Sequence, residues 1–429
     1  MNYILIYVAI GLVVMTLYLR RQRRIHNSYS AELQEAVKSG LTEPPSLHPV
    51  ADFSRCMGSG ACVKACPENA LGVVDGKAVL INAAHCIGHG ACMSACPVEA
   101  IKLVFGTEKR GIDIPNVNPQ FETNIPGIYI AGELGGMGLI RKAAQQGRQA
   151  MDSIRKKMGS KADFDVLIVG CGPAGLSAGL SAIHHKMRYK LIEQEDSLGG
   201  SVYHYPRQKI AMTAPVELDL VGMVKFNDVQ KETLLAFWLD VVKKTRLQIN
   251  FCECMESVER EDGCFRVRTN RGSYTAGAVL LAMGRRGTPR TLEVPGEESA
   301  KVAYRLLDPA QYVGQSVLVV GGGDSALEAA IALSQEKDTD VILSYRSAAF
   351  SRVKQKNRSA LDQQEKAGRL RVLLNSTVSS IQDHHVDLDH DGVVQRFKND
   401  VVLVCAGGVL PTPLLQKIGI QFDTKVGTV

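Results

Sequence analysis

Six of the eleven cysteines lie in two segments that repeat at an offset of 30 residues. The first segment reads RCMGSGACVKACPENAL, the second reads HCIGHGACMSACPVEAI, and each cysteine run ends in Cys-Pro. Disulfide scaffolds of this cysteine density are short secreted chains, and C-x5-C-x3-C is not a spacing that zinc sites use. The repeat therefore predicts a metal–sulfur centre. Its candidate ligands are the thiolates of Cys56, Cys62, Cys66, Cys86, Cys92 and Cys96.

The repeat resembles the two-cluster bacterial ferredoxins over residues 50 to 104, whose runs read C-x2-C-x2-C-x3-C-P. The second cysteine of each run is replaced here, by Ser59 in the first copy and by His89 in the second. In that family the last cysteine of each run ligates the cluster of the other run. The resemblance therefore implies one ligand set of Cys56, Cys62 and Cys96 and another of Cys86, Cys92 and Cys66.

The fourth ligand of each cluster is left open by the sequence. Three thiolates suffice for a 3Fe-4S cluster, whereas a 4Fe-4S cluster could also take the Ser59 oxygen or the His89 nitrogen. A neutral imidazole that replaces a thiolate removes a negative charge and should raise the reduction potential. A decayed module that binds nothing is the alternative. The cysteines, prolines and glycines of both copies stay in register, which argues against it.

A dinucleotide-binding pattern begins at Asp165 with DVLIVGCGPAGLSAGLSA. An apolar strand leads into Gly170-x-Gly172-x-x-Gly175 and then into a helix of small residues, and the next strand ends at Glu193. The glycines provide a tight turn, close approach of the backbone to a pyrophosphate, and close packing of helix on strand. The acidic residue would hold a ribose hydroxyl. Gly200, in a later Gly-Gly turn, is a further candidate contact of the same cofactor.

A second pattern of the same kind starts at Ser316 with SVLVVGGGDSALEAAIALS. Its following strand, DVILSYR, ends in a basic residue rather than an acidic one. A basic residue at this place suits the 2′-phosphate of NADPH, and it favours NADPH over NADH; simple solvation of these basic side chains is the alternative. The candidate cofactor-binding residues of this pattern are Gly321, Gly323, Asp324, Ala326, Arg346 and Arg352.

With the segments AGAVLLAMGRRGTPRTLEVPGEE and DVVLVCAGGVLPTPLL, the chain resembles the FAD- and NAD(P)-binding reductases of the thioredoxin reductase class. This resemblance implies FAD in the first dinucleotide domain and NAD(P)H in a second domain inserted into it. Members of the class carry a Cys-x-x-Cys just before the second fingerprint. Residues 300 to 316 contain no cysteine, which makes a disulfide substrate handled by an enzyme dithiol an unfavoured reading.

Those reductases end with a segment of the form T-x-x-P-G-I-Y-A-x-G-D followed by a helix. No such segment stands at the end of this sequence, but residues 123 to 151 read TNIPGIYIAGELGGMGLIRKAAQQGRQAM. The resemblance therefore implies a circular permutation, with Gly132 and Glu133 against the FAD and a helix from Leu139 to Lys157 beside the flavin. Such a join is tolerated because the termini of a domain often lie close together.

The N-terminus predicts a membrane anchor. Residues 3 to 19 read YILIYVAIGLVVMTLYL, without charge or proline, and Arg20, Arg21, Arg23 and Arg24 follow. A helix of that length, at 1.5 Å per residue, just covers a bilayer core of about 30 Å. The positive-inside rule then places the rest of the chain in the cytoplasm. A cleaved signal peptide is less favoured, because it would need positive charge first and a small-residue cleavage site afterwards.

Composition fits this reading. The 429 residues are 45% hydrophobic and 22% charged, as in ordinary globular domains, and the formal charge of +6 is too mild to indicate a nucleic-acid partner. The predicted fold class is α/β, with two Rossmann-like domains, a small α+β dicluster ferredoxin domain and an N-terminal transmembrane helix. The expected boundaries are anchor 1–24, linker 25–49, ferredoxin domain 50–105, permuted segment 106–160, FAD domain 161–285, NAD(P) domain 286–405 and return segment 406–429.

Together these parts predict an NAD(P)H-dependent FAD and iron–sulfur oxidoreductase. A flavin converts a two-electron hydride into single electrons, which the clusters pass to or from a redox protein or a quinone. Electron flow of this kind needs no acid–base pair, so no catalytic residue is predicted. The alternatives are a small-molecule disulfide or quinone reductase with accessory clusters, and a redox sensor without turnover.

Overall fold

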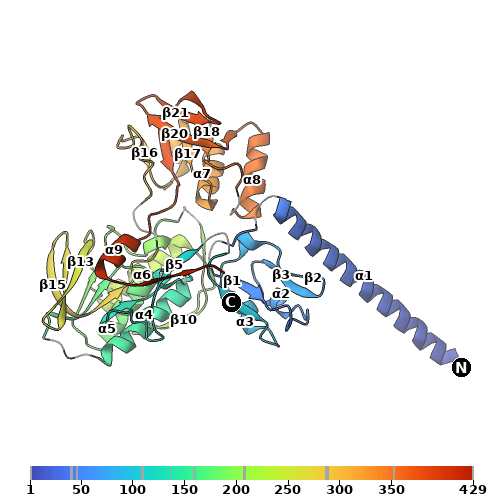
Figure 1. Cartoon of the computed structure of the whole chain (residues 1–429), viewed down its shortest axis with the longest axis horizontal. Helices are drawn as coiled ribbons and strands as arrows, with labels where there is room; N and C mark the ends of the chain where they lie inside the picture. The colour runs from blue at the N-terminus through green and yellow to red at the C-terminus, as the bar shows by residue number, and fades with distance from the viewer. Residues whose placement is uncertain are drawn as a thin grey trace.

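The computed structural model describes residues 2–38, 42–44, 47–107, 111–136, 138–157, 159, 161–205, 209–285, 289–350 and 353–427. Four parts are visible in Figure 1: two α/β units, a small cysteine-bearing domain between them and the N-terminal helix, and that helix itself. We refer to them as the first unit, the second unit, the cysteine domain and helix α1.

The first unit is built on one sheet with the order β13-β14-β15-β7-β8, and β6 also pairs with β15. The parallel strands are almost fully buried, because helices cover the sheet and the sequence supplies runs such as FDVLIV. Its strands are β6 (Ile128–Ile130), β7 (Phe164–Val169), β8 (Tyr189–Ile192), β13 (Met255–Glu261), β14 (Cys264–Thr269) and β15 (Gly272–Leu281). Its main helices are α4 (Ile140–Arg155), α5 (Pro173–His184) and α6 (Lys231–Thr245).

Short hairpins and turns complete the first unit. Strand β9 pairs with β12 and β10 with β11, both antiparallel, next to helix α6. These elements are β9 (Ile210–Met212), β10 (Val216–Leu218), β11 (Gly222–Val224), β12 (Asp228–Gln230), η2 (Glu133–Gly135) and η3 (Gly200–Val202).

Two segments distant in sequence also complete the first unit. Strand β6 pairs in parallel with β15, so residues ahead of the first fingerprint belong to its central sheet. Strand β24 (Phe422–Lys425) pairs with β5 (Ile112–Pro115), and α9 (Thr412–Ile418) packs its buried Leu415 into the same core. The first unit is therefore assembled from both ends of the chain.

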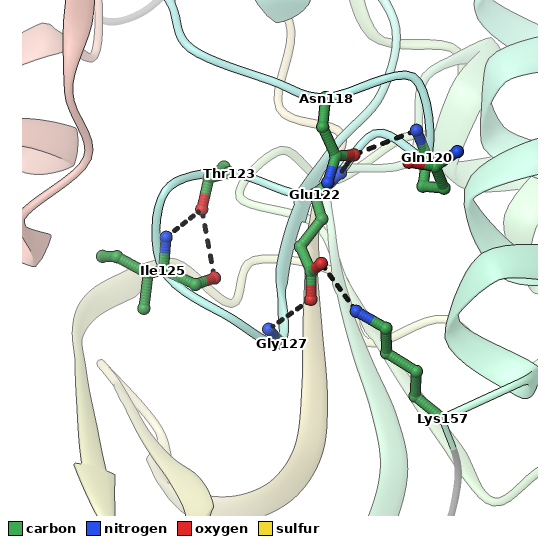
Figure 2. A network of polar contacts seen from close by, with 7 residues as sticks. All are labelled: Asn118, Gln120, Glu122, Thr123, Ile125, Gly127 and Lys157. Carbon is green, nitrogen blue, oxygen red and sulfur yellow. Dashed lines mark hydrogen bonds and ion pairs between the residues drawn. The ribbon is translucent and has the colours of Figure 1, made fainter.

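A polar network holds the turn that precedes β6 (Figure 2). The buried carboxylate of Glu122 accepts a hydrogen bond from the backbone N–H of Gly127 at 2.9 Å and an ion pair from Lys157 Nζ at 2.7 Å. Lys157 directly follows α4, while Gly127 precedes β6. The network thus fixes the strand and the helix of one segment relative to each other.

The second unit is contiguous in sequence. Its five-stranded parallel sheet has the order β16-β23-β17-β18-β19 and is joined by an antiparallel three-stranded sheet, β20-β21-β22. The parallel strands are β16 (Val302–Ala303), β17 (Ser316–Val320), β18 (Asp340–Ser344), β19 (Leu370–Leu373) and β23 (Val401–Val404). The other elements are β20 (Ser376–Ile381), β21 (His385–His390), β22 (Val393–Lys398), α7 (Asp324–Ser334), α8 (Gln355–Lys366) and η4 (Pro309–Tyr312).

The cysteine domain consists of two antiparallel strand pairs and two short helices. Strand β1 (His48–Ala51) pairs with β4 (Ile101–Val104), and β2 (Leu71–Val74) pairs with β3 (Lys77–Leu80). Helices α2 (Ala61–Ala65) and α3 (Ala91–Ser94) each carry one buried cysteine, and η1 (Ala83–His85) precedes the second cysteine run. Its small core consists mainly of cysteine, alanine and aliphatic side chains.

Helix α1 (Asn2–Lys38) is continuous; its C-terminal part packs on β2 of the cysteine domain, and its N-terminal part extends away from the rest of the molecule (Figure 1). Helix α1 therefore continues through the arginines after residue 19 into residues 25–38, which were expected to belong to the linker. Within the described part of the chain, no helix is long and apolar enough to cross a membrane. The side chains of residues 2–6, 8 and 9, which belong to or adjoin the predicted anchor, lie outside the described set.

Candidate functional site

The cysteine domain brings the six clustered cysteines into two groups, each drawn from both copies of the repeat. Burial raises the pKa of the Cys62 thiol, and the nearby Cys56 and Cys96 raise it further. Burial also raises the pKa of Cys92 to about 11, with smaller contributions that include Cys86 and Cys66. We call Cys56, Cys62, Cys96 and Ser59 the first half-site, and Cys66, Cys86, Cys92 and His89 the second half-site.

The chemistry of these groups fits an iron–sulfur cluster. Buried thiols with raised pKa values stay protonated unless a positive centre stabilises the thiolate. Backbone N–H groups already point at sulfur: Ala78 N lies 3.4 Å from Cys56 Sγ, and Ala100 N lies 3.3 Å from Cys96 Sγ. Among the described residues, no group of His, Cys, Asp or Glu is arranged to hold a single metal ion. A cluster of several irons does not require its ligands to converge on one point.

The two positions that lack cysteine differ. Ser59 is exposed, and its hydroxyl accepts a hydrogen bond from Ala61 N at 3.5 Å, at the start of α2. His89 Nε2 is buried and has no hydrogen-bond partner in the described structure. It lines a small cavity together with Cys66, Cys86 and Cys92. Burial lowers the pKa of His89, which favours the neutral imidazole that a metal needs.

A cleft of about 1720 Å³ lies between the two α/β units and is lined by both fingerprints. From the first unit it receives the predicted residues Gly132, Glu133, Gly170, Gly172, Glu193 and Gly200. From the second unit it receives Gly321, Gly323, Asp324 and Arg346. Sequence positions on two separate patterns and on the segment before them therefore meet at one site.

In the first unit the fingerprint turn is tightly packed. Gly170 has a φ of +102°, and a Cβ on Gly175 would lie 1.8 Å from the carbonyl oxygen of Gly170. Glu193 is buried, and its carboxylate accepts hydrogen bonds from Cys171 N at 2.6 Å and from Glu195 N at 3.0 Å. Burial raises the pKa of Glu193. The acidic side chain thus fixes the turn itself, at the place predicted for a ribose contact.

The segment before the fingerprint is also held in place. Gly132, with a φ of +84°, donates its N–H to Gln146 Oε1 of α4 at 2.9 Å. Gly147 of the same helix lies directly on α5, because a Cβ there would be 2.1 Å from the carbonyl oxygen of Ala174. Helix α4 spans residues 140 to 155, close to the predicted 139 to 157. Glu133 starts the turn η2 at the edge of the cleft.

In the second unit the fingerprint turn is also closely packed, because a Cβ on Gly321 would lie 2.4 Å from the carbonyl oxygen of Cys405. Tyr345 lies over Gly322 and stacks on Phe350 with ring centroids 5.2 Å apart. Asp324 Oδ1 accepts hydrogen bonds from Lys354 N and Asn357 Nδ2, both at 2.8 Å, so it fixes the start of α8.

The remaining predicted residues of the second unit are Ala326, Arg346 and Arg352. Ala326 is fully buried beneath the fingerprint turn. Arg346 is exposed at the cleft, as a contact for a phosphate requires. Arg352 lies outside the described residues.

Contacts between the two units were not foreseen from the sequence. Arg305 Nη1 donates to His204 Nδ1 at 2.7 Å, and Arg305 Nη2 donates to Glu195 Oε1 at 3.3 Å. Because arginine can only donate, His204 carries its proton on Nε2 in the neutral form. Lys209 Nζ and Glu328 Oε2 form a second bridge, at 3.1 Å. Charges separated by more than a hundred residues carry no sequence signal of pairing, so only the fold reveals these bridges.

The remaining cysteines do not form a redox pair. Cys252 and Cys254 lie just before β13, and Cys252 has a φ of +52°. All eleven cysteines are free thiols. Burial raises the pKa of Cys171 and Cys405, the latter to about 12, so these two thiols are unreactive.

Comparison with known proteins agrees with this arrangement. Residues 167–428, more than half of the chain, match the pyridine nucleotide-disulphide oxidoreductase family, and residues 48–97 match a 4Fe-4S dicluster domain. The chain belongs to the pyridine nucleotide-disulphide oxidoreductase family.

Individual relatives show which kinds of reductase this chain is similar to. A ferredoxin–NADP reductase of Thermus thermophilus is 31% identical over 283 residues, which cover 62% of this chain and 81% of the relative. A ferredoxin–NADP reductase of Streptococcus sanguinis is 30% identical over 182 residues, but the match spans 42% of this chain and only about half, 53%, of that relative. The bacillithiol disulfide reductase Bdr of Staphylococcus aureus has a similar structure, with a TM-score of 0.53, 25% identity, and coverage of 61% of this chain and 81% of that one.

The predicted α/β dinucleotide-binding fold with a ferredoxin domain is thereby confirmed, and so is the enzyme class. The protein is an FAD-dependent NAD(P)H oxidoreductase with an iron–sulfur domain.

Proposed function

We propose that this protein passes electrons between NADPH and a one-electron redox partner, through FAD in the first unit and two iron–sulfur clusters in the cysteine domain. The observation that carries the proposal is the shared cleft, which both fingerprints line. When bound, the flavin would supply the exchange between hydride chemistry and single electrons, and the clusters would supply single-electron transfer. The direction of electron flow depends on the reduction potentials of the cofactors and of the partner.

The residues of the chain do the positioning. The Gly170 turn and the N-terminus of α5 would hold the pyrophosphate of FAD, and Glu193 would hold its ribose. In the second unit, Gly321 and Gly323 open the turn for the nicotinamide dinucleotide, and Arg346 would pair with a 2′-phosphate. Arg346 is exposed and can therefore move onto the ligand.

The first unit is proposed to be a circularly permuted form of the reductase domain. Three observations support this. Strand β6 joins the central sheet beside β15, α4 packs on the fingerprint helix α5, and β24 near the chain end pairs with β5 near its start. Under this proposal, the segment from 112 to 157 would take the sheet and helix positions that the class fills from the end of its chain. Residues 106 to 160 also connect the cysteine domain directly to this unit.

For the clusters, the geometry favours unlike fourth positions. The buried, unpartnered His89 Nε2 beside three thiols suits a fourth ligand of a 4Fe-4S cluster. The exposed Ser59 hydroxyl already serves the start of α2, which suits a 3Fe-4S cluster or a solvent-ligated iron in the first half-site. Replacement of His89 by Ala should remove one iron per protein, and the His89→Cys variant should restore it. Unchanged iron content in His89→Ala would contradict the assignment.

The experiment that tests the function is anaerobic addition of NADPH to the purified, cluster-loaded protein. Flavin absorbance near its visible maximum should bleach, and electron paramagnetic resonance should then show reduced clusters. NADH in place of NADPH serves as the comparison. Absence of bleaching with either nucleotide would overturn the proposal. A purely sensory protein would be reduced once and would not turn over with any acceptor.

A small-molecule disulfide or quinone reductase is the alternative proposal, and for its disulfide form a structural relative is a bacillithiol disulfide reductase. The described cleft contains Cys254 and Cys405 but no cysteine pair. Under this alternative, Cys62→Ala and Cys92→Ala variants would keep full turnover. Loss of turnover in both variants would favour the electron-transfer chain.

We also propose membrane attachment through α1, with the catalytic body in the cytoplasm. The charge-free run over residues 3 to 19, the arginines after it, and the apolar side chains exposed on the helix from Ile10 to Leu19 support this proposal. Removal of residues 1–24 should release the protein from membranes. Full-length protein that stays in the soluble fraction would contradict attachment, and extraction by carbonate would indicate a helix that lies on the membrane surface.

A further inference from the structure

The two halves of the cysteine domain are related by an internal symmetry that places equivalent residues around each half-site. Gly60 and Gly90 both precede a cysteine helix in the left-handed conformation, with φ of +69° and +82°. Val73 of β2 approaches Gly60, and Leu103 of β4 approaches Gly90 in the same way. Strands β2 and β4 are therefore equivalent elements, one beside each half-site.

The symmetry ends two residues further along each strand. After Val73, the chain reverses at Asp75, whose side chain is 89% exposed. After Leu103, the chain continues through Phe105 toward the first unit. The strand beside the first half-site therefore ends in a surface turn, whereas the strand beside the second half-site leads into the flavoprotein.

Phe105 makes the contact between the two parts. A Cβ on Gly136 would lie 2.6 Å from Cζ of the Phe105 ring, so the ring lies directly on that glycine. Gly136 ends the turn η2 that starts with Glu133, a residue that lines the cleft. The backbone carbonyl of Phe105 accepts a hydrogen bond from Gly427 N at 2.8 Å, which fixes its position from the other side.

The two loops that carry Ser59 and His89 in place of the second cysteine also differ in their exposure. In the first half-site Met57 is 67% exposed and Ser59 is exposed as well. In the second half-site Gly88 is buried against the carbonyl oxygen of Leu47. His85, which adjoins Cys86, accepts a hydrogen bond from the backbone N–H of Gln355 in the second unit at 3.3 Å. Both α/β units thus contact elements beside the second half-site, whereas helix α1 packs on β2 beside the first, where Met57 and Ser59 are exposed.

We infer that the two half-sites have different places in electron transfer. The second half-site, with His89, exchanges electrons with the flavin cleft across Phe105, and the first half-site, with Ser59, exchanges them with the external partner. This inference rests on the proposed function. In the overall balance, NADPH loses two electrons to become NADP⁺ and releases one proton, and two partner molecules each gain one electron. Because electron transfer slows steeply with distance, the second half-site, on the side of the flavin cleft, is reduced first.

The order can be tested on the wild-type protein by a readout that does not depend on turnover. A soluble dysprosium chelate shortens the spin relaxation of paramagnetic centres near the surface. In electron paramagnetic resonance of the cluster-loaded protein, the chelate should strongly shorten the relaxation of one cluster signal and hardly change that of the other. The Ser59→Cys and His89→Cys variants assign the two signals, because each alters one fourth position. An affected signal that shifts in His89→Cys would overturn the inference.

Variants that remove one half-site provide a second test. In Cys62→Ala, NADPH should still reduce the remaining cluster at close to the wild-type rate. In Cys92→Ala, the flavin should bleach while the remaining cluster stays oxidised on the same timescale. The reverse pattern, or equal rates in both variants, would overturn the order. Failure of the flavin to bleach in the wild type would instead overturn the proposed function, so the two failures are distinguishable. Iron and flavin content of each variant confirm assembly.

Phe105→Ala tests the contact itself while leaving every cysteine in place. Cluster reduction after NADPH addition should slow severalfold, because the ring that contacts Gly136 is lost. Flavin bleaching should keep its rate. Phe53→Ala is the matched control, because Phe53 is 55% exposed on the outer half of the same domain. An unchanged rate of cluster reduction in Phe105→Ala, or equal slowing in both variants, would contradict a bridging contact.

Discussion

The two α/β units contain the same fingerprint but are built differently. The second unit is contiguous, and its five-stranded sheet comes from residues 302 to 404 alone. The first unit takes β6 and α4 from before its fingerprint, and β24 and α9 from the end of the chain. At the third fingerprint position the first unit has Gly175, which lies directly on the Gly170 carbonyl group, where the second unit has Ala326; its acidic residue is buried, whereas the basic residue of the second unit is exposed.

The difference shows how one motif serves two kinds of ligand. A resident cofactor such as FAD suits a rigid, fully packed turn that several chain segments hold in place. A nucleotide that binds and leaves in each cycle suits an exposed side chain and a turn that one contiguous segment of the chain builds. The following predictions test this contrast, and they start with the change that should have the largest effect.

A substitution at the third fingerprint position should have the most different effects in the two units. In the first unit, Gly175→Ala would place a Cβ 1.8 Å from the Gly170 carbonyl oxygen. It should abolish flavin retention and lower the free energy of unfolding by about 3 kcal/mol or more. In the second unit, where Ala326 is the natural residue, Ala326→Gly should cost only about 1 kcal/mol. Flavin content and thermal melting measure both. Equal costs would refute the contrast.

The packing of α4 on α5 should matter nearly as much. Gly147→Ala would bring a Cβ within 2.1 Å of the Ala174 carbonyl oxygen, so the two helices must separate. We expect a loss of about 2 kcal/mol in unfolding free energy and weaker flavin binding. Gly272→Ala is the control, because a Cβ there meets nothing within 4 Å. Chemical denaturation with flavin fluorescence is the measurement, and a stable, flavin-replete Gly147→Ala protein would show that α4 is not part of the flavin site.

The second unit should respond in affinity rather than in stability. Arg346→Ala should raise the KM for NADPH by roughly tenfold, which corresponds to one charge-assisted contact of about 1.4 kcal/mol, and should leave the KM for NADH unchanged. Arg371→Ala is the control, since Arg371 lies on β19 and does not line the cleft. A parallel rise for both nucleotides would show that Arg346 does not contact the 2′-phosphate.

The smallest effect, and the only one expected to depend on pH, concerns the Glu122 network. Burial alone would raise the pKa of Glu122, but the Lys157 ion pair and the Gly127 N–H outweigh burial and hold the pKa below 4.5. A lowered folded-state pKa means that the contribution is complete above the unfolded value and disappears as pH falls through the folded value.

Glu122→Gln should therefore destabilise the protein by about 1 to 2 kcal/mol at neutral pH, and the difference from wild type should vanish in acid. Unfolding midpoints between pH 7 and about pH 3 measure this, where acid titrates the carboxylates. The exposed Glu298→Gln provides the control. A difference that stays constant across this range would show that the charge of Glu122 does not stabilise the turn.

Much of the fold was readable from sequence because its signals are local. The strand, glycine turn and helix of each fingerprint, and the cysteine repeat, each lie within about 30 residues, the usual size of such motifs. The helix over 140 to 155 followed from resemblance to a class rather than from a local signal. Helix α1 continues past residue 24 into the expected linker, because this polar stretch has no glycine or proline to end the helix before Lys38.

The sequence by itself determined the fold class and the enzyme class, and it predicts which residues hold cofactors, because backbone turns and thiols act through short-range chemistry. The tertiary structure decided which of those residues meet. It joined the predicted residues of both fingerprints in one cleft, paired Arg305 with His204, and left Ser59 exposed while burying His89 Nε2. It also placed Phe105 on Gly136. Such choices depend on packing between segments far apart in the chain, and no local pattern encodes them.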